Sequence, residues 1–387
     1  MGHKYAVIGV GRQGTAAAYD MGKFGDADDI ILVDSQEGIA EKAAKRINEL
    51  LTRDVARGLC VDIVEMDKLK TLLQGTTSFL SAAPYRYNLQ LTELAISIGS
   101  NMCDLGGNTE IVRKQLAYNT EALKAGITIV PDCGMGPGMN ISLAMYAISL
   151  MDKAKEVLIW DGGLPLEPKP PWNYLLTFAF NGLANEYYGN AYFLRNGKVT
   201  EVECFDGFEE LEFSPPLGRL EAFVTSGGLS TAPWTLEGNL ERLENKTLRY
   251  PGHWAQFRAF RQLGLLSLDP VDVGGTELIP RNVLCALLEP KIVRPKIKDI
   301  CVILVKCVGE KKGEKTEVYV ELVDLYDERT GFTAMQRITG WHASIIAILA
   351  AKERMAPGAI PVEIAVPGIT MVQEARKRGL KVKERFE

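Results

Sequence analysis

The chain has 387 residues, a length that favours about two domains of ordinary size. Its 44 Lys and Arg residues against 49 Asp and Glu residues give a formal net charge of −5, and no long basic run offers a surface to a nucleic acid or an anionic membrane. No run of about 18 apolar residues is present to span a membrane, and the first residues lead into a strand pattern rather than a signal peptide, so we expect a cytoplasmic protein.

The first predicted strand leads into a glycine-rich turn. Gly9, Gly11 and Gly14 have the spacing G-x-G-x-x-G, and small, helix-compatible residues follow them. A strand-to-helix turn of this kind aims backbone N–H groups and the helix dipole at a phosphate. We predict a dinucleotide-binding turn, to which Arg12 and Gln13 also belong. The alternative is a tight turn in an unrelated α/β domain.

An acidic residue follows the second predicted strand. Asp34 ends the apolar run IILV and lies 20 residues after Gly14. At this position a carboxylate accepts hydrogen bonds from the free ribose hydroxyls of NAD and repels the 2′-phosphate of NADP. We therefore predict NAD as the cofactor, with Asp34 and Ser35 beside its ribose. Arg12, which is close to the same region, keeps NADP open as the alternative.

The pattern then alternates between helices and strands up to residue 134. Helices are predicted at residues 38–51, 88–98 and 110–125, and strands at 59–64, 77–84, 101–106 and 127–134. Such alternation implies parallel strands with right-handed crossovers, and so a Rossmann-type doubly wound sheet of the α/β class. Ligands bind at the carboxyl ends of such strands, which adds Ala82, Ala83 and Pro84 to the predicted cofactor contacts.

From about residue 150 the pattern changes to alternating apolar and polar residues. Strands of an antiparallel sheet are indicated by the runs EVLIWDGG, YLLTFAF, AYFLRNGKVTEVECF, DICVILVKCVG and TEVYVELVDLYD. Hairpin turns are predicted at residues 195–198 and 309–315. A helical stretch at residues 342–355 and a strand-like run at 362–367 close the chain. We expect an α+β domain with an antiparallel sheet beside the parallel one.

The cysteine pattern gives no sign of a metal centre. The sequence has seven cysteines, an odd number, and none forms a C-x-x-C pair. Most of them lie in apolar runs, where a free thiol behaves as a small hydrophobic side chain. We expect reduced, structural cysteines and no metal site.

Four segments of the chain carry a family resemblance. They are GGLPLEPKPPWNY (162–174), LGRLEAFVTSGGLSTAPWTLEG (217–238), KTLRYPGHW (246–254) and ITGWHASIIAILAAKERMAPGAIPVEIAVPG (338–368). Together they resemble the saccharopine dehydrogenase family, and within it the branch of lysine 6-dehydrogenases. The resemblance implies a dinucleotide-binding domain of residues 1–135, completed by about 338–387, and a domain of residues 136–337 for substrate binding and oligomerisation.

The same resemblance implies an activity. It is the NAD-dependent oxidative deamination of the ε-amine of L-lysine to 2-aminoadipate 6-semialdehyde, with release of ammonia, by a homo-oligomer of two or more subunits. The amine gives up a hydride only when neutral, and its usual pKa is near ~10.4, so the site must desolvate it or supply a base. Asp104, at the end of a predicted strand, and His253 are the candidates. The alternatives are a turn cap for Asp104 and a packed, hydrogen-bonded residue for His253.

An amino acid substrate also needs donors for its carboxylate. Arginine supplies a planar fork of N–H groups, and Arg249 is our first choice, with Arg219 the second. A structural salt bridge is the alternative for each. Further predicted contacts to the substrate or nicotinamide come from loops, at Thr231 or Ser230, Tyr85 and Asn108.

Two other functions stay open. One is a different reaction of the same family, that of a saccharopine or carboxynorspermidine dehydrogenase (reductase), whose larger substrates call for more arginines around the cleft. The other is a non-catalytic NAD-binding redox sensor, which would bind the cofactor and turn over no amine.

Overall fold

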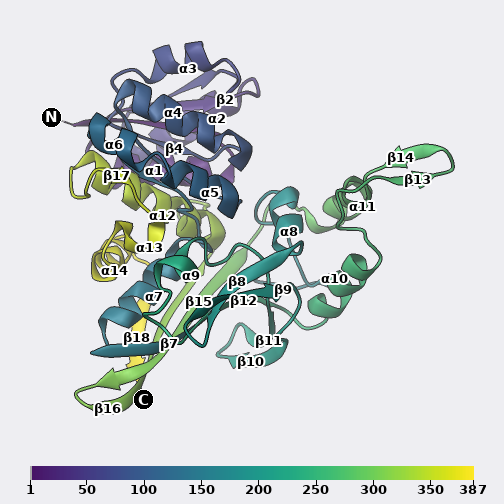
Figure 1. The fold of residues 1–387 in the computed structure, drawn as a ribbon. Helices are drawn as coiled ribbons and strands as arrows, with labels where there is room; N and C mark the ends of the chain where they lie inside the picture. The colour runs from purple at the N-terminus through teal and green to yellow at the C-terminus, as the bar shows by residue number, and fades with distance from the viewer. Residues whose placement is uncertain (1) are drawn as a thin grey trace.

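The computed structural model describes residues 2–387 and contains two large sheets. Figure 1 shows the first sheet with its helices in purple and blue, and the second, in teal and green, below it. The yellow C-terminal helices lie beside the first sheet, while the C-terminus itself lies at the far end of the second. A thin arm, which carries its own small hairpin, projects to one side (Figure 1).

The first sheet has seven strands, all paired in parallel. They are β1 (His3–Ile8), β2 (Ala27–Asp34), β3 (Ala56–Cys60), β4 (Ser78–Ser81), β5 (Asn101–Asp104), β6 (Thr128–Val130) and β17 (Gly358–Ala359). Their order is β17-β6-β5-β4-β1-β2-β3. The chain runs outward from β1 in one direction and then from β4 in the other, which is the strand order of a dinucleotide-binding doubly wound fold. The predicted fold class is confirmed for this part.

Helices link these strands. They are α1 (Arg12–Phe24), α2 (Ile39–Leu51), α3 (Met66–Leu73), α4 (Asn88–Ile98), α5 (Thr109–Leu116) and α6 (Asn119–Ala125), with a short 3-10 turn, η1 (Tyr85–Tyr87). The helix predicted at 110–125 is divided in two. The strand predicted at 59–64 ends at Cys60, since the Asp62 carboxylate accepts a hydrogen bond from the Val64 N–H at 3.1 Å and forms a turn there.

A long C-terminal helix, α12 (Ala334–Ala351), packs on α1. A Cβ added to Gly340 would lie 2.8 Å from the Gln13 carbonyl oxygen and 2.9 Å from the Ala17 nitrogen. The two backbones approach this closely because α1 also presents small residues, among them Ala16 and Ala17. Helix α12 thus supports the helix that follows the glycine turn.

The second sheet has nine strands. They are β7 (Lys153–Pro165), β8 (Asn190–Arg195), β9 (Lys198–Glu203), β10 (Glu209–Phe213), β11 (Gly218–Phe223), β12 (Arg242–Arg249), β15 (Asp299–Lys311), β16 (Glu314–Leu325) and β18 (Val382–Phe386). Both predicted hairpins are present, β8–β9 and β15–β16. All pairs are antiparallel except β12 with β7, which is parallel, so the sheet is mixed rather than purely antiparallel.

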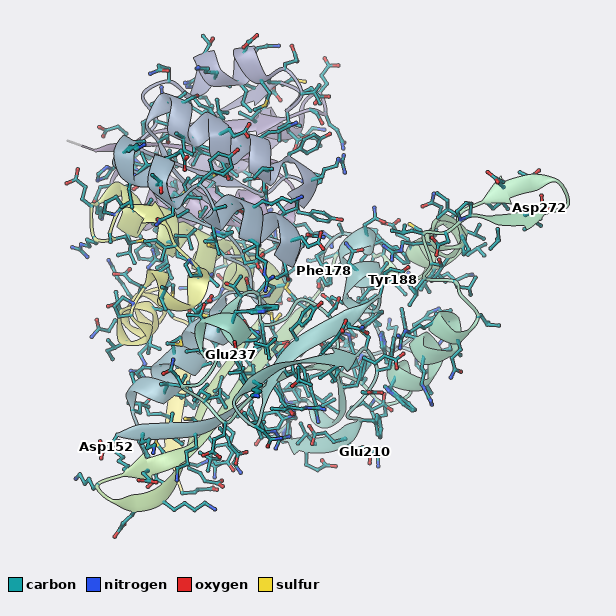
Figure 2. All side chains as sticks on the ribbon, in the orientation of Figure 1. Asp152, Phe178, Tyr188, Glu210, Glu237 and Asp272 are labelled. Carbon is teal, nitrogen blue, oxygen red and sulfur yellow. The ribbon has the colours of Figure 1, made fainter. Side chains whose placement is uncertain are left out.

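Helices and one hairpin complete the structure. They are α7 (Met139–Ser149), α8 (Phe180–Glu186), α9 (Ala232–Thr235), α10 (His253–Gln262), α11 (Pro280–Ile292), α13 (Val362–Ala365), α14 (Gly368–Lys377) and the hairpin β13–β14 (Val271–Val273, Thr276–Leu278). The arm consists of this hairpin and α11, and Asp272 marks its tip in Figure 2. The predicted strand at 174–180 is a loop that leads into α8, and the strand-like run at 362–367 contains the short helix α13.

The C-terminal segment contacts both sheets. Strand β17 pairs with β6 of the first sheet, in line with the expectation that this segment completes the first domain. Strand β18, however, pairs with β16 of the second sheet, so that expectation is wrong for residues 382–386. Helix α7, which follows the first sheet in sequence, packs on α14 and on β7 and β15. The two parts of the chain are therefore interlocked, and the boundary at residue 135 stays a prediction.

Candidate active site

Each glycine of the first turn meets a different steric demand. Gly9 has a φ of +88°, and a Cβ there would lie 2.7 Å from the Ala82 carbonyl oxygen. A Cβ at Gly14 would lie 2.1 Å from the Gly9 carbonyl oxygen, whereas one at Gly11 would meet nothing within 4 Å. Gly9 and Gly14 therefore allow the turn to form, and Gly11 keeps open the space through which a pyrophosphate approaches the backbone.

Asp34 lies beside this turn. Its carboxylate accepts hydrogen bonds from the Val10 N–H and the Gln36 N–H, both at 3.0 Å, and its side chain is half-buried. Each carboxylate oxygen has a second lone pair, so both can still accept from a hydroxyl. Ser35, the next residue, is exposed. The arrangement fits the predicted role of Asp34 toward a ribose.

The side chains of Arg12 and Gln13 turn toward the second sheet. Arg12 Nη1 donates to the Leu176 carbonyl at 2.8 Å, and Gln13 Nε2 donates to the Thr177 carbonyl at 3.3 Å. Because both side chains are engaged in this way, it is the backbone N–H groups of Arg12 and Gln13, at the start of α1, that could make the predicted contacts to the cofactor. The loop before α8 is thereby attached directly to the dinucleotide-binding turn.

The loops after β4 and β5 form the other side of this edge. Ala82 and Ala83 are half-buried and their backbone lies against Gly9, while Pro84 is exposed. Tyr85 packs on Gly107, whose added Cβ would lie 3.0 Å from the Tyr85 ring. Asn108 is the N-cap of α5, since its side chain accepts from the Ile111 N–H at 3.1 Å. The side chain of Asn108 thus has a structural role.

Asp104 is fully buried and its oxygens already have partners. Oδ1 accepts from the Gly106 N–H at 2.8 Å and the Asp132 N–H at 3.3 Å, and Oδ2 accepts from Gln115 Nε2 at 2.8 Å. Burial raises the pKa of Asp104 to about 6, against these hydrogen bonds. These hydrogen bonds join the loops after β5 and β6 and engage both oxygens of Asp104, as a turn cap would, and its role as a base stays a prediction.

Asp132 differs from Asp104 because it keeps one oxygen without a partner. It follows β6, is 2% exposed and has a positive φ of 62°. Its Oδ2 accepts a short hydrogen bond from the hydroxyl of Ser230, which itself has a φ of 47°, while Oδ1 has no partner among the described residues. Burial, and then the charge of Asp104, raise the pKa of Asp132 to about 7. Two non-glycine residues in left-handed conformations thus meet between the loop after β6 and the loop before α9, and such strain is typical of functional sites.

A second polar cluster links α8, β12 and α10. Arg249 donates to the Tyr187 hydroxyl from Nε at 3.0 Å, to the Leu248 carbonyl from Nη1 at 2.9 Å and to Glu186 Oε2 from Nη2 at 3.0 Å. The Tyr187 hydroxyl also lies 2.8 Å from His253 Nε2. We call Glu186, Tyr187, Arg249 and His253 the arginine cluster.

His253 is buried at the start of α10. The Tyr187 hydroxyl, which accepts from Arg249 Nε, lies 2.8 Å from His253 Nε2, while Nδ1 is buried with no hydrogen-bond partner among the described residues. The ring stacks on Phe257, with centroids 4.1 Å apart. Burial, with Arg249 nearby, holds the pKa of His253 well below its usual range. A neutral imidazole at neutral pH does not fit the proton shuttle that the sequence suggested for pH values near 7.

The loop that packs on the arginine cluster carries two buried hydroxyls, those of Tyr174 and Thr177. The Tyr174 ring lies 5.3 Å from the Arg249 guanidinium, and the buried hydroxyls of Tyr174 and Thr177 have no hydrogen-bond partner in the part of the chain that the structure describes. Burial of Glu186, with a smaller effect from Asp161, raises its pKa to about 7 against the opposing charge of Arg249. Figure 2 shows Phe178 and Tyr188, on either side of α8, at the level where the two parts of the molecule meet.

Two predicted substrate contacts lie elsewhere. Thr231 donates to Glu363 of α13 at 2.9 Å, together with Thr235, so it joins the C-terminal segment to α9. Arg219 is an exposed residue of β11 that pairs with Glu210 at 3.7 Å. Figure 2 shows Glu210 at the lower edge of the second sheet, away from the first. The structure does not bring Arg219 to the arginine cluster.

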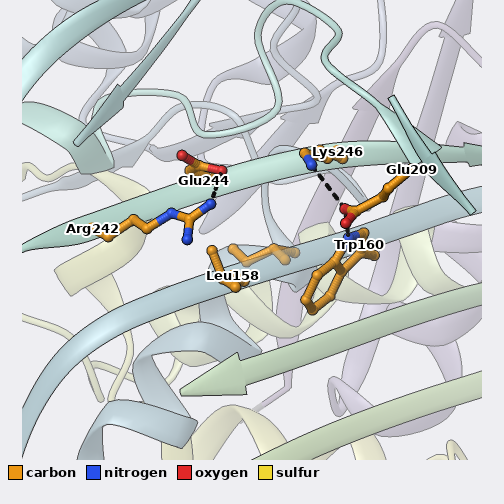
Figure 3. Close-up of a pocket in the computed structure, with 7 residues that line it drawn as sticks. Leu158, Trp160, Glu209, Arg242, Glu244 and Lys246 are labelled. Carbon is orange, nitrogen blue, oxygen red and sulfur yellow. Dashed lines mark hydrogen bonds and ion pairs between the residues drawn. The ribbon is translucent and has the colours of Figure 1, made fainter. Parts of the chain in front are cut away.

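A hollow on the second sheet is not a substrate site. Figure 3 shows it between β7 and β12, with a volume of about 40 Å³, which is room for a few water molecules. Its charges are already paired, Lys246 with Glu209 at 2.8 Å and Arg242 with Glu244 at 2.9 Å. Among the described residues, no group of three or more His, Cys, Asp or Glu side chains could hold a metal ion, and no helix is long and apolar enough to cross a membrane.

The strand order, the glycine turn and Asp34 define a dinucleotide-binding protein with a second domain at the edge where the nicotinamide would lie. Comparison with family sequence models agrees. Residues 5–130 match the saccharopine dehydrogenase NADP binding domain, and residues 134–379 match the saccharopine dehydrogenase C-terminal domain. The chain belongs to the saccharopine dehydrogenase family, and its first part is an NAD(P)-binding domain.

Curated relatives match part of the chain at low sequence identity. The mitochondrial α-aminoadipic semialdehyde synthase of Bos taurus is 28% identical over 216 residues, 52% of this chain and 23% of the relative. The saccharopine dehydrogenase [NADP(+), L-glutamate-forming] of Saccharomyces cerevisiae is 22% identical over 160 residues, 39% of this chain and 34% of the relative. The chain thus spans about a quarter to a third of the length of these relatives.

Solved structures show the same fold. The apo saccharopine dehydrogenase (L-Glu forming) of Saccharomyces cerevisiae has a TM-score of 0.77 at 18% identity and covers 100% of both chains. The homospermidine synthase of Legionella pneumophila in complex with NAD has a TM-score of 0.69 at 13% identity, over 100% of this chain and 92% of the other. At these identities the likeness concerns the fold alone.

Proposed function

We propose that the protein is an NAD-dependent amino acid dehydrogenase that acts on a CH–NH bond, and that its substrate is L-lysine. The ε-amine would be oxidised to an iminium, and water would convert the iminium to 2-aminoadipate 6-semialdehyde and ammonia. The observation that carries the proposal is the partner-free oxygen of Asp132 at the carboxyl edge of the first sheet. It is the group best suited to take a proton from an amine beside the cofactor.

The chemistry sets the requirements of the site. Protonated lysine, NAD⁺ and water yield the semialdehyde, NADH, ammonium and one further proton, so a base must accept protons before and after the oxidation. Bound NAD⁺ supplies the acceptor for the hydride. Asp132, whose pKa is about 7, can accept a proton near neutral pH, and Ser230 holds its other oxygen in place. We move the role of base from Asp104 to Asp132, since both oxygens of Asp104 are engaged by the protein.

The preference for NAD over NADP rests on Asp34. Its carboxylate lies at the glycine turn and retains lone pairs for two ribose hydroxyls. Arg12, the candidate partner for a 2′-phosphate, is engaged with the Leu176 carbonyl at 2.8 Å. The yeast relative is named as an NADP(+) enzyme, so the cofactor must be measured on this chain.

A second candidate is saccharopine as substrate, which the names of the relatives in yeast and of the solved yeast structure favour. The test is direct. The purified protein is incubated with NAD⁺ or NADP⁺ and with L-lysine or saccharopine, and NADH or NADPH formation is followed by absorbance. Turnover of lysine with NAD⁺ supports the proposal; turnover of saccharopine alone contradicts it. Cofactor binding without turnover of any basic amino acid or secondary amine would favour the redox sensor.

We further propose a cytoplasmic homo-oligomer, with residues 136–337 as the domain for substrate and subunit contacts. The mixed second sheet and the projecting arm provide the surfaces for this role. Light scattering after gel filtration would measure the mass of the particle against the 42.6 kDa of one chain. A particle of one chain's mass would contradict the assembly.

A further inference from the structure

Glu186 is the member of the arginine cluster that reaches the surface most. Its side chain is 28% exposed, whereas that of Arg249, its partner at 3.0 Å, is 3% exposed. Tyr187 and His253 are buried. Only Oε2 of Glu186 accepts a hydrogen bond from the described residues, so Oε1 is available to an incoming donor. A ligand that approaches this cluster therefore meets a carboxylate first, with a guanidinium directly behind it.

Arg249 is held in one place. Tyr187 accepts from Nε, the Leu248 carbonyl accepts from Nη1, and the rings of Tyr174 and Tyr187 lie 5.3 and 5.9 Å from the guanidinium carbon. A guanidinium has more N–H donors than these acceptors and Glu186 use. The side chain can therefore receive a further carboxylate without a change in its own position.

The pair lies close to the dinucleotide-binding edge. The loop that carries Tyr174 also carries Leu176 and Thr177, whose carbonyls accept from Arg12 and Gln13 at the start of α1. Three residues of extended chain span at most about 10 Å. A small molecule held by Glu186 and Arg249 is thus within reach of a nicotinamide at the edge of the first sheet.

Two buried hydroxyls in the same loop point to a ligand. The Tyr174 and Thr177 side chains are 3% and 1% exposed, and neither hydroxyl has a hydrogen-bond partner among the described residues. Buried polar groups are rarely left in this state unless a ligand or water completes them. Both hydroxyls lie in the loop that packs on the arginine cluster, where a polar ligand would supply the missing partner.

We propose that Glu186 and Arg249 together form the receptor for the head group of an α-amino acid: the ammonium binds Glu186, the carboxylate binds Arg249, and the Tyr174 and Thr177 hydroxyls complete the contacts. The proposal rests on the proposed amino acid substrate and specifies how that substrate is held. Each charge of the pair exchanges one opposite charge for another, so neither is left unpaired when the ligand enters. In the free protein Glu186 and Arg249 are paired with each other, and in the complex each would be paired with the opposite charge of the zwitterionic ligand.

Two measurements test this receptor. The first is the binding of L-norleucine, an α-amino acid without an ε-amine, to the NAD-loaded protein by calorimetry. Glu186→Gln should weaken this binding at least 10-fold, and Glu186→Asp should recover part of it. The matched control is Glu203→Gln, which removes another carboxylate from an ion pair with an arginine, Arg261 at 2.7 Å, at the end of β9; within residues 2–387 no hydrogen bond or ion pair joins the Glu203 side chain to the arginine cluster, so this variant should bind norleucine as the wild type does.

The second measurement is the preference for L-lysine over Nα-acetyl-L-lysine, which keeps the carboxylate and lacks the α-ammonium. The ratio of kcat/KM for the two substrates should fall at least 10-fold in Glu186→Gln, because only the contact to the ammonium is lost. A merely structural ion pair would lower both values alike and leave the ratio unchanged.

The outcomes separate this inference from the proposed function. Norleucine binding that depends on Glu186 upholds the receptor even if lysine is not oxidised, in which case the proposed reaction alone fails. Oxidation of lysine with an unchanged preference in folded Glu186→Gln overturns the receptor and leaves the reaction standing. Failure of the wild type to bind norleucine at any concentration up to that of saturating lysine also overturns it.

Discussion

The Ser230 hydroxyl, in the loop before α9, donates a short hydrogen bond to Oδ2 of Asp132, which follows β6 and lies 98 residues earlier in the sequence. Both residues have a positive φ, and the other oxygen of Asp132 has no partner among the described residues. The contact fixes the orientation of a buried carboxyl at the carboxyl edge of the first sheet. Asp132 is therefore the residue on which the proposed chemistry depends most.

Asp132→Asn should lower kcat/KM about 100-fold or more, since the amide cannot accept the proton. In the wild type, the kcat/KM profile should rise with pH through about 7 as Asp132 loses its proton, and continue to rise as the substrate amine does. Steady-state assays between pH 6 and 10 (roughly the span of the two ionisations) check both. Asp104→Asn is the control: a comparable loss there, with an active Asp132→Asn, would return the role of base to Asp104.

The same substitution should stabilise the protein at alkaline pH. The pKa of Asp132 is raised from its usual 3.8 to about 7 in the fold. The folded state therefore binds a proton that the unfolded state has released, and stability from this group is present at acidic pH and lost as the pH rises through 7. Asp132→Asn removes this cost, which is at most about 4 kcal/mol at about 1.4 kcal/mol per pKa unit.

The measurement is urea unfolding of both proteins at several pH values. The difference in free energy of unfolding should grow in favour of Asp132→Asn from pH 5 to pH 8, values that bracket the raised pKa (about 7). A difference that does not depend on pH would mean that the carboxyl has an ordinary pKa in the fold, and would remove the argument that it is tuned for proton transfer.

The sequence predicts the parts of the site that are local in the chain. The glycine spacing and Asp34 lie within one strand–helix–strand unit, so their geometry follows from the pattern of that unit. Asp132 with Ser230 and Glu186 with Arg249 join segments far apart in sequence, and no local pattern specifies such contacts. Asp104 is the more prominent acid in the sequence because it ends a strand in a glycine-rich segment, but the pattern does not show that three hydrogen bonds already engage its oxygens.

The mixed character of the second sheet was missed for a related reason. Alternation of apolar and polar residues shows that a strand has one buried face, but it does not show the direction of its neighbour. Strand β12 lies parallel to β7 because the chain between them passes through α8, β8 to β11 and α9 before it returns. No sequence pattern singles out Glu186 and Tyr187, whose contacts with Arg249 are seen only in the folded structure.

Two glycine substitutions should separate folding from cofactor binding. Gly11→Ala adds a Cβ with nothing within 4 Å, at a φ of −66° that alanine adopts, so the melting temperature should be unchanged or slightly higher. NAD affinity should nevertheless fall at least about 10-fold, since the methyl group occupies the approach of the pyrophosphate.

Gly14→Ala places a Cβ 2.1 Å from the Gly9 carbonyl oxygen and should destabilise the fold by about 1–3 kcal/mol. Thermal unfolding and NADH fluorescence titration measure both; normal NAD binding by Gly11→Ala would place the pyrophosphate elsewhere.

Asp34→Ser should shift the cofactor preference toward NADP. Serine is neutral, so it no longer repels a 2′-phosphate, and it makes fewer hydrogen bonds to the ribose of NAD. The ratio of the Kd values for NADPH and NADH should fall about 10-fold or more from its wild-type value. Because Asp34 also accepts from the Val10 N–H, thermal unfolding must show that the variant keeps the glycine turn. Tighter binding of NADPH than NADH by the wild type would refute the proposed role of Asp34.

His253→Gln distinguishes a titrating histidine from a positioning one. His253 is buried, its pKa lies well below the usual value, and its Nε2 is hydrogen-bonded to the Tyr187 hydroxyl, which in turn accepts from Arg249. The glutamine amide can either donate or accept in the same hydrogen bond with Tyr187, so the limb of the kcat/KM profile near neutral pH should stay where it is, and KM for lysine should rise modestly. Tyr187→Phe removes the link itself and should raise KM further, because Arg249 loses the acceptor for its Nε. A shift of the neutral limb in His253→Gln, with Tyr187→Phe unaffected, would instead make His253 the proton shuttle that the sequence suggested.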